Sequence, residues 1–339
     1  MSDFDRDSLA SILKGWLAIE STSGQERLFL ETLEDFFRAH DWHVERQEVE
    51  EDRWNLIIHD GHPTRLLYST HVDTVPPHLP VRRQHNVIWG RGACDTKGGL
   101  LAMWAAGSQL RDQGFEGLGF LLVVGEEVDH CGAKVARDLD FNDPQIILCE
   151  PTKNRVVRAQ KGMLRLTLCS TGEAGHSAFP NDGESAIHPL LDAIGRLRHH
   201  PWPSDDILGP TTLNVGVITG GVAANVFAPQ ARAELLFRAV APVKPMLDRV
   251  QEVVGPEIEV EECVYNDPVF FQPPEGVATC TVPFNTDATY LAELGEIWLV
   301  GPGDIRCAHS DDEKIDLDEL FAGIQLYTDL TRRVFDGAD

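Results

Sequence analysis

The sequence predicts an α/β fold: a mixed, mostly parallel sheet sandwiched by helices, with a smaller α+β domain of ferredoxin-like order inserted into it. Continuous apolar runs that end in acidic residues alternate with helical patterns early in the chain, which is typical of central strands covered on both faces. The middle of the chain changes to longer strands of alternating polarity. A strand and an amphipathic helix then resume the first pattern, so we expect the middle segment to be an insertion.

The length of the chain also favours two domains. With 339 residues it exceeds the roughly 250 to 300 residues at which single hydrophobic cores stop growing. We expect residues 1–155 and 267–339 to form one domain and residues 156–266 to form the inserted one.

The larger domain is expected to begin with two helices and then to build its sheet. Apolar spacing predicts helices over residues 8–19, 25–39, 100–110, 286–294 and 316–335. Strands are predicted over residues 43–49, 54–59, 65–70, 118–124, 145–149 and 296–300. A glycine-rich turn over residues 90–99 leads into the third helix.

The inserted domain is expected to follow the order β, α, β, β, α, β. Its strands are predicted over residues 158–170, 211–219, 231–240 and 257–264. Its helices are predicted over residues 185–198 and 243–254. This order fits a sheet covered by helices on one face, and a proline-rich segment over residues 268–274 is the expected return linker.

The composition excludes two classes of partner. The chain has 54 acidic and 29 basic residues and a formal charge of −25. Nucleic acid and anionic membrane both require a basic surface, so we expect neither as a partner. An acidic surface is compatible with divalent metals or cationic substrates, but solubility alone is a sufficient reason for it.

The cysteines and the N-terminus indicate a cytoplasmic protein. Seven cysteines, an odd number with no Cys-x-x-Cys pair, favour reduced thiols over a disulfide framework. The N-terminal residues are acidic and precede an amphipathic helix, which is unlike a secretory signal, and no apolar run has membrane-spanning length.

Charged side chains gather where the predicted strands end, and they define the candidate site. These residues are His71, Asp73, Asp95, Glu126, Glu127, Glu150 and His309. Ligands bind beyond the carboxyl ends of strands in open α/β sheets, so these side chains are expected to converge. Two histidines and three carboxylates around a further carboxylate base are typical of a paired-zinc hydrolase, because two Zn²⁺ ions neutralise four carboxylates that would otherwise repel one another.

The spacing within two pairs of these residues predicts how their side chains point. His71 and Asp73 lie two residues apart, so both point to one face if the strand continues, and a carboxylate can fix the tautomer of a metal-binding imidazole. Glu126 and Glu127 are adjacent and therefore point to opposite sides of an extended segment. One can hold metal while the other faces the water.

Several candidate residues, inside and outside this set, also have simpler interpretations. Asp95 beside a glycine turn is a plausible helix N-cap, and Glu150 before a proline is a plausible solvated strand end. His176 could be an ordinary loop histidine, and Arg238 could form a surface ion pair on a strand. The cysteines near the proposed ligands (Cys94, Cys149 and Cys307) are interpreted as small apolar fillers. The other histidines, His130 among them, are interpreted as structural or solvated.

Over nearly its whole length the chain resembles the zinc-dependent family of aminoacylase, acetylornithine deacetylase, succinyl-diaminopimelate desuccinylase and related carboxypeptidases. Each motif is weak alone, but six occur in the family's order. They are the segments 69–76 (STHVDTVP), 90–99 (GRGACDTKGG), 126–127 (EE), 150–152 (EPT), 175–177 (GHS) and 301–309 (GPGDIRCAH). The resemblance implies a zinc exopeptidase-like catalytic domain with an inserted dimerisation domain.

The resemblance also implies a ligand set. Asp95 would bridge two zinc ions, of which one is further held by His71 and Glu150 and the other by Glu127 and His309. Two Zn²⁺ per subunit are thus expected, with Co²⁺ or Mn²⁺ as possible substitutes.

The remaining roles are likewise implied by the family. Asp73 would orient His71, and Glu126 would be the general base. His176 of the inserted domain would reach the partner subunit's site in a homodimer and stabilise the oxyanion. Asn225 and Arg238 match positions that bind the substrate carboxylate.

The expected function is a di-zinc amidohydrolase that removes the acyl group from a small N-acyl amino acid. The motifs at 150–152, 286–288 (TDA) and 301–309 look most like acetylornithine or acetylcitrulline deacetylase of arginine or lysine biosynthesis. A dipeptidase or carboxypeptidase of the same family is the alternative. A non-catalytic metabolite-binding relative is a third interpretation, and the presence of Glu126 beside an intact ligand set argues against it.

Overall fold

The computed structural model describes residues 4–179 and 183–337, which form two compact units. Within these residues the first unit runs to Arg158 and includes Phe271–Cys280 and the chain from Thr286 onward. The second unit consists of Ala159–Phe270 and Thr281–Asn285. The first three residues of the acidic N-terminal segment lie outside the described residues. No helix in the described ranges is long and apolar enough to cross a membrane.

The first unit is built on a six-stranded mixed sheet in the order β1-β2-β6-β3-β7-β17. Its strands are β1 (His43–Glu50), β2 (Arg53–His59), β3 (Leu66–His71), β6 (Leu118–Val123), β7 (Gln145–Leu148) and β17 (Ile297–Leu299). β3 pairs in parallel with both β6 and β7, and β17 pairs in parallel with β7. β1 and β2 form an antiparallel edge. The expected mixed, mainly parallel sheet is confirmed.

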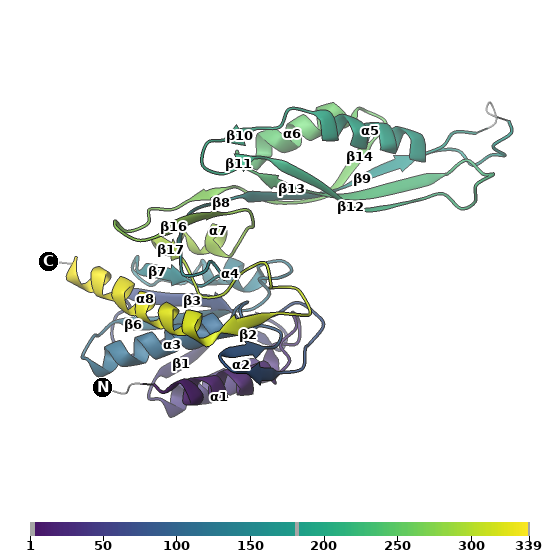
Figure 1. Ribbon diagram of the computed structural model, residues 1–339. Helices are drawn as coiled ribbons and strands as arrows, with labels where there is room; N and C mark the ends of the chain where they lie inside the picture. The colour runs from purple at the N-terminus through teal and green to yellow at the C-terminus, as the bar shows by residue number, and fades with distance from the viewer. Residues whose placement is uncertain (1–3, 180–182, 338–339) are drawn as a thin grey trace. The chain divides into compact units, whose positions relative to one another are not determined.

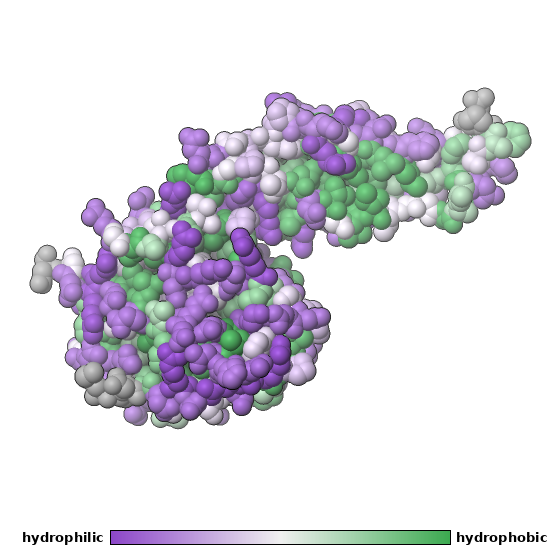
Figure 2. Space-filling view, in the orientation of Figure 1, coloured by the Kyte–Doolittle hydropathy of each residue, from purple (hydrophilic) through white to green (hydrophobic). Residues whose placement is uncertain are grey.

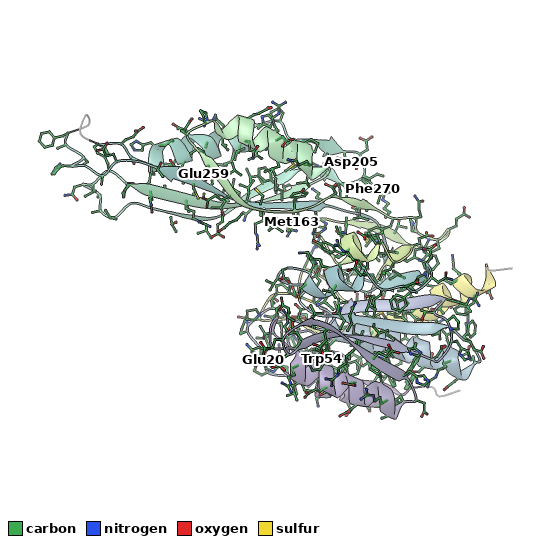
Figure 3. All side chains as sticks on the ribbon, turned by 180° about the vertical axis from the view of Figure 1, so that it is seen from behind. Glu20, Trp54, Met163, Asp205, Glu259 and Phe270 are labelled. Atoms are coloured by element: carbon green, nitrogen blue, oxygen red, sulfur yellow. The ribbon has the colours of Figure 1, made fainter. Side chains whose placement is uncertain are left out.

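Helices cover both faces of this sheet, with α4 and α7 on one face and α1, α2 and α3 on the other (Figure 1). The helices of the unit are α1 (Arg6–Leu17), α2 (Arg27–Ala39), α3 (Lys97–Asp112), α4 (Cys131–Ala136), α7 (Ala288–Leu291) and α8 (Leu317–Asp336). Every residue of β3 and β6 is buried, as the unbroken apolar pattern of strands covered on both faces requires. Trp54 of β2, labelled in Figure 3, is buried in the same core.

Side-chain caps fix the beginning of two of these helices. Asp5 accepts hydrogen bonds from the backbone N–H groups of Asp7 and Ser8 at the start of α1. Asp316 accepts from the N–H of Asp318 at the start of α8, the yellow helix of Figure 1. The helix expected over residues 286–294 is only the short α7, because turns replace its outer residues.

A small sheet completes the first unit, in the order β18-β5-β4. Its strands are β4 (Arg82–Gln84), β5 (Val87–Trp89) and β18 (Lys314–Asp316). The pairing of β18 with β5 holds the segment around Glu313 beside the glycine-rich turn that follows β5. A further sheet, β15-β8-β16, contains the segments at which the chain changes units: β8 (Val156–Gln160), β15 (Val269–Phe270) and β16 (Thr279–Val282).

The second unit is a four-stranded antiparallel sheet with two helices packed on one face. Its main elements are β9 (Gly162–Thr171), α5 (Ile187–His199), β12 (Thr212–Gly220), β13 (Gln230–Ala239), α6 (Val243–Val254) and β14 (Glu259–Asn266). The sheet order β12-β13-β9-β14 is the ferredoxin-like arrangement expected of this chain order. The short strands β10 (Ser204–Asp205) and β11 (Gly209–Pro210) pair separately. Met163 and Glu259 on β9 and β14 are labelled in Figure 3.

Candidate active site

The candidate ligands lie where neighbouring parallel strands of the first unit end. His71 is the last residue of β3, and Glu127 and Glu150 follow β6 and β7. His309 lies in the segment that follows β17. Because these four strands are parallel, their carboxyl ends meet at one edge of the sheet, and the structure brings the four side chains together there.

Asp95 lies at the centre of this cluster and faces both histidines. Its Oδ1 is 3.2 Å from Nε2 of His71, and its Oδ2 is 3.3 Å from Nε2 of His309. Oε1 of Glu150 is 3.9 Å from the same nitrogen of His71, and Oε2 of Glu127 is 3.0 Å from that of His309. The donor atoms therefore lie on two sides of Asp95, His71 with Glu150 and His309 with Glu127, and ligand atoms of His71, Asp95 and Glu127 also lie within 4.8 Å of one another.

These distances suit a pair of metal ions. Ligand atoms about 2.0 to 2.1 Å from a tetrahedral ion lie roughly 3.3 Å apart, which is the spacing seen around Asp95. The mixture of imidazole nitrogen and carboxylate oxygen is a donor set that zinc, cobalt and manganese accept. The residues present thus fit the two ions that the sequence predicts.

The charges of the cluster point the same way. Burial raises the pKa of Glu150 well above its ordinary value, and repulsion by Asp95 raises it further. Burial also opposes a charge on His71, yet hydrogen bonds to Asp73 and Asp95 raise its pKa. Without metal the cluster retains extra protons, and a divalent cation would take their place and relieve the repulsion between the carboxylates.

Asp73 faces His71, as expected, and makes further contacts that were not expected. His71 Nδ1 lies 2.9 Å from the backbone carbonyl oxygen of Asp73 and 3.5 Å from its carboxylate. The carboxylate itself accepts hydrogen bonds from the backbone N–H groups of Glu126 (3.1 Å) and Glu127 (3.2 Å) and from the hydroxyl of Ser23 (2.7 Å). Asp73 therefore holds the Glu126–Glu127 turn as well as facing His71.

Glu126 lies among acidic neighbours and close to a histidine that the sequence analysis set aside. Its Oε1 is 3.8 Å from Nδ1 of His130, and that nitrogen is 2.9 Å from Oδ1 of Asp287. Burial raises the pKa of Glu126 well above its ordinary value, with a further contribution from Glu150. His130 is buried and not solvated as one interpretation had it, and no sequence signal links it to Asp287, 157 residues away.

Glu313 is a second residue that the sequence analysis missed. Its side chain is buried, and its Oε1 accepts hydrogen bonds from the backbone N–H groups of Cys94 (3.3 Å) and Asp95 (3.2 Å). Its Oε2 is 2.6 Å from Arg91, and burial raises the pKa of Glu313 to about 7. Glu313 thus fixes the backbone that carries Asp95, where the peptide bond to Thr96 is cis.

The other predicted residues belong to the second unit. His176 and Asn225 lie on adjacent loops: His176 forms a β-bridge with Val226, and the N–H of Ser177 donates to the carbonyl of Asn225 (3.1 Å). Both side chains are exposed. Arg238 lies near the far end of β13, eight residues or about 26 Å of extended strand from Gln230, which is close to the Asn225 loop. The structure therefore groups His176 with Asn225 and not with Arg238.

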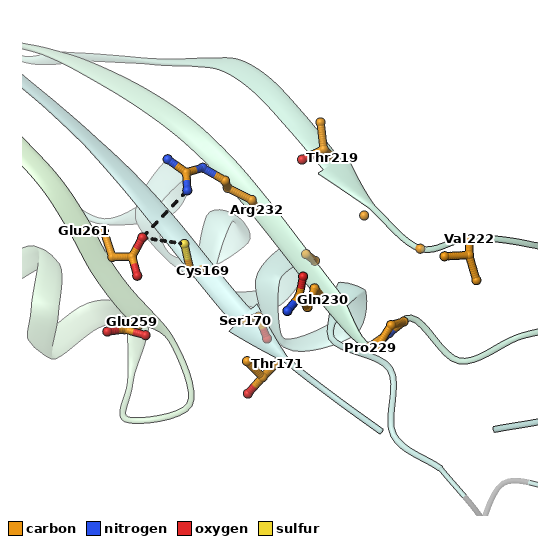
Figure 4. A pocket seen from close by; sticks show the side chains of 13 residues that line it. Cys169, Ser170, Thr171, Thr219, Val222, Pro229, Gln230, Arg232, Glu259 and Glu261 are labelled. Atoms are coloured by element: carbon orange, nitrogen blue, oxygen red, sulfur yellow. Dashed lines mark hydrogen bonds and ion pairs between the residues drawn. The ribbon is translucent and has the colours of Figure 1, made fainter. Parts of the chain in front are cut away.

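The second unit also has a hollow of about 520 Å³ on its sheet, lined by residues of β9, β12, β13 and β14 (Figure 4). Two of its polar groups meet at one carboxylate: Arg232 lies 3.8 Å from Glu261, and the Cys169 thiol lies 3.3 Å from the same carboxylate. We assign no ligand to this hollow.

Comparisons of the sequence and of the structure with known proteins each identify peptidases. The family model described as peptidase family M20/M25/M40 matches residues 67–333. A peptidase M20 domain-containing protein of Schizosaccharomyces pombe is 34% identical, covering 95% of this chain and 83% of its own length. A probable carboxypeptidase of Aspergillus terreus is also 34% identical, covering 92% and 83%. The crystal structure of aminopeptidase PepT from Bacillus cereus superimposes with a TM-score of 0.80 at 20% identity, covering 98% and 99%.

Proposed function

The chain belongs to peptidase family M20/M25/M40 and is a metal-dependent hydrolase of amide bonds; we propose that it binds two metal ions and cleaves the amide that joins an acyl group to an amino acid. The observation that carries the proposal is Asp95, whose two carboxylate oxygens face two different histidines. Zinc is the proposed metal, with His71 and Glu150 on one side of Asp95 and Glu127 and His309 on the other.

Bound there, the ions would supply Lewis-acid polarisation of the scissile carbonyl and would acidify the attacking water. Glu126 is the proposed general base: its carboxylate takes the proton of the water and returns it to the leaving nitrogen. Asp73 supports this step, because its hydrogen bonds fix the backbone of Glu126 and Glu127. This scheme does not depend on which acyl group the substrate carries, since Glu126 needs only a water and an amide within reach.

The second unit supplies the proposed substrate contacts. His176 would reach the partner subunit's site and donate there to the oxyanion that forms at the scissile carbonyl, and Asn225 would bind the substrate carboxylate. Arg238 is a candidate partner for the substrate carboxylate, and its distance along β13 from the His176 loop gives it a separate role.

We propose a homodimer formed by the second unit. β12 is an edge strand of its sheet, and the exposed side chains on and beside it include Val217, Ile218 and Leu191 of α5. Figure 2 shows hydrophobic side chains gathered on this face of the second unit. An edge strand flanked by apolar side chains is suited to pairing with a second copy.

The free cysteines support a cytoplasmic location.

The proposed substrate is an N-acetylated basic or citrulline-like amino acid. The support is the similarity of the motifs at 150–152, 286–288 and 301–309 to acetylornithine and acetylcitrulline deacetylases. Cleavage of a C-terminal residue from a dipeptide or peptide is the second candidate, and the names of the carboxypeptidase relatives favour it.

A substrate panel separates the two. Zinc- and cobalt-loaded protein is assayed with acetylornithine, acetylcitrulline, other N-acetyl amino acids and a set of dipeptides, with metal content measured on the same sample. Faster release of acetate than of any dipeptide residue is expected. No acetate from acetylornithine or acetylcitrulline would reject that substrate class, and faster dipeptide cleavage would establish the carboxypeptidase or dipeptidase alternative.

A further inference from the structure

Two cysteine thiols face each other inside the candidate active site. Sγ of Cys94 lies 3.5 Å from Sγ of Cys307, although the two residues are 213 positions apart in the sequence. Both thiols are free. The sequence analysis interpreted these cysteines as apolar fillers, but an apolar role does not require two sulfurs in contact.

Each cysteine is joined by a short stretch of backbone to a proposed metal ligand. Cys94 immediately precedes Asp95, and Cys307 lies two residues before His309. These two ligands face each other, since Oδ2 of Asp95 lies 3.3 Å from Nε2 of His309. A change in the distance between the two sulfurs therefore acts directly on the distance between two ligands.

The surroundings differ for the two thiols. Cys94 is completely buried, and its backbone is held by the hydrogen bond from its N–H to Glu313. Gly303 packs so closely that a Cβ there would lie 2.6 Å from Cβ of Cys94. Cys307 is partly exposed and its thiol lies 3.1 Å from the carbonyl of Asp304. A small oxidant from solvent thus meets Cys307 first.

We propose that Cys94 and Cys307 are a reversible oxidation site, at which a hydroperoxide forms a disulfide that displaces Asp95 and His309 and releases metal. In the first step the sulfur of Cys307 attacks one oxygen of hydrogen peroxide, the O–O bond breaks, and a sulfenic acid and one water form. In the second step the sulfur of Cys94 attacks the sulfenic sulfur, the S–O bond breaks, and a second water leaves. Two thiols and one hydrogen peroxide give one disulfide and two waters.

The geometric consequence follows from bond lengths. A disulfide requires the sulfurs to close from 3.5 Å to about 2.05 Å, a contraction of roughly 1.5 Å. Metal–ligand distances tolerate only about 0.2 Å. Tight packing by Gly303 and the hydrogen bond to Glu313 limit the movement of Cys94, so the segment that carries Cys307 and His309 takes most of the displacement.

The test treats zinc-loaded full-length protein with increasing hydrogen peroxide. Peptide mapping by mass spectrometry measures the Cys94–Cys307 cross-link, and a chromogenic indicator measures released zinc. The expected result is a cross-link that rises together with the release of at least one zinc per chain. A phosphine reductant should reverse the cross-link and restore the zinc content.

Three serine variants make the test specific. Cys307→Ser and Cys94→Ser should each retain zinc at peroxide concentrations that release it from the wild type, and Cys94→Ser should accumulate oxidised Cys307 without a cross-link. Cys280→Ser is the matched control: the thiol of this cysteine of the first unit donates to the carbonyl of Arg155 (3.5 Å), and its loss should leave the response of the wild type unchanged. Two separate serine variants keep the test valid if one of them fails to fold.

The outcomes are distinct. The proposal is overturned if no Cys94–Cys307 cross-link forms, or if it forms while zinc stays bound. Zinc release rests on the metal site proposed above, whereas peptide mapping requires neither metal nor activity. A protein that holds no zinc before oxidation but still forms the cross-link would contradict the proposed function and the metal-release step, and would leave the disulfide itself established.

Discussion

Substitution of Asp73 should distinguish an effect on metal binding from an effect on the stability of the fold. Asp73→Ala removes the acceptor for the N–H groups of Glu126 and Glu127 and for the hydroxyl of Ser23. A buried donor left without a partner costs about 1 to 3 kcal/mol, and these three are only partly buried, so we expect a loss of about 3 kcal/mol in the free energy of unfolding. The carboxylate that faces His71 also disappears, and losing such a partner weakens metal binding roughly 10- to 100-fold.

Asp60→Ala is the matched control. Oδ2 of Asp60 accepts hydrogen bonds from the N–H groups of Gly117 (2.8 Å) and Leu118 (2.9 Å), at the opposite end of β6 from Glu126. The N–H of His62 donates to Oδ1 (3.0 Å), so this substitution leaves three backbone donors without an acceptor. It should destabilise the fold by a similar amount and leave metal affinity unchanged.

Urea unfolding of the metal-free proteins measures the free energy of unfolding. Competition with a zinc chelator measures the affinity of each protein for zinc. Both variants should be destabilised, and only Asp73→Ala should bind zinc more weakly. Unchanged zinc affinity in Asp73→Ala, or an equal loss of affinity in Asp60→Ala, would refute the assigned role of Asp73.

Three further predictions concern the chemistry and the charge of the site. Glu126→Gln should retain bound metal and lose at least about 100-fold in kcat, because it removes the general base; unchanged kcat would remove Glu126 from the mechanism. His176→Ala should lower kcat with little effect on metal content, and an equal loss of both would make His176 structural. The metal-free protein should become less stable as the pH rises above about 4.5, because a carboxyl group with a raised pKa, such as Glu150, contributes its stability when protonated and loses it as the pH passes its folded pKa. Thermal unfolding with and without a chelator checks this, since bound metal should stabilise the protein more at pH 8 than at pH 5, and a difference that is larger at pH 5 would contradict the charge argument.

The fold was predictable because the strands of the two units differ in their pattern of apolar and polar residues. The apolar runs at 118–124 and 145–149 became inner strands of a mixed, mainly parallel sheet, and of the residues in these runs only Gln145 is half-buried. The alternating strands after residue 156 became an antiparallel sheet with one covered face. The gathering of His71, Glu127 and Glu150 also followed, since the ends of parallel strands meet at one edge. Asp95 instead follows β5 of the small antiparallel sheet.

The parts that could not be predicted depend on side-chain direction and on contacts between distant segments. The carboxylate of Asp73 turns toward the backbone of Glu126, which a two-residue spacing does not specify. Glu313 reaches Asp95 only because β18 pairs with β5. His130 sits in a left-handed turn that aims it at Asp287, and its local sequence carries no metal or base motif.

The central claim is that two metal ions share Asp95. The most direct test is the number of zinc ions bound per chain, measured by elemental analysis after dialysis against buffered free zinc, for the wild type and for Asp95→Ala. Both groups of donors include Asp95, so the wild type should hold two ions and the variant should lose affinity for both. An Asp95→Ala protein that keeps one ion at the affinity of the wild type would contradict the shared ligand.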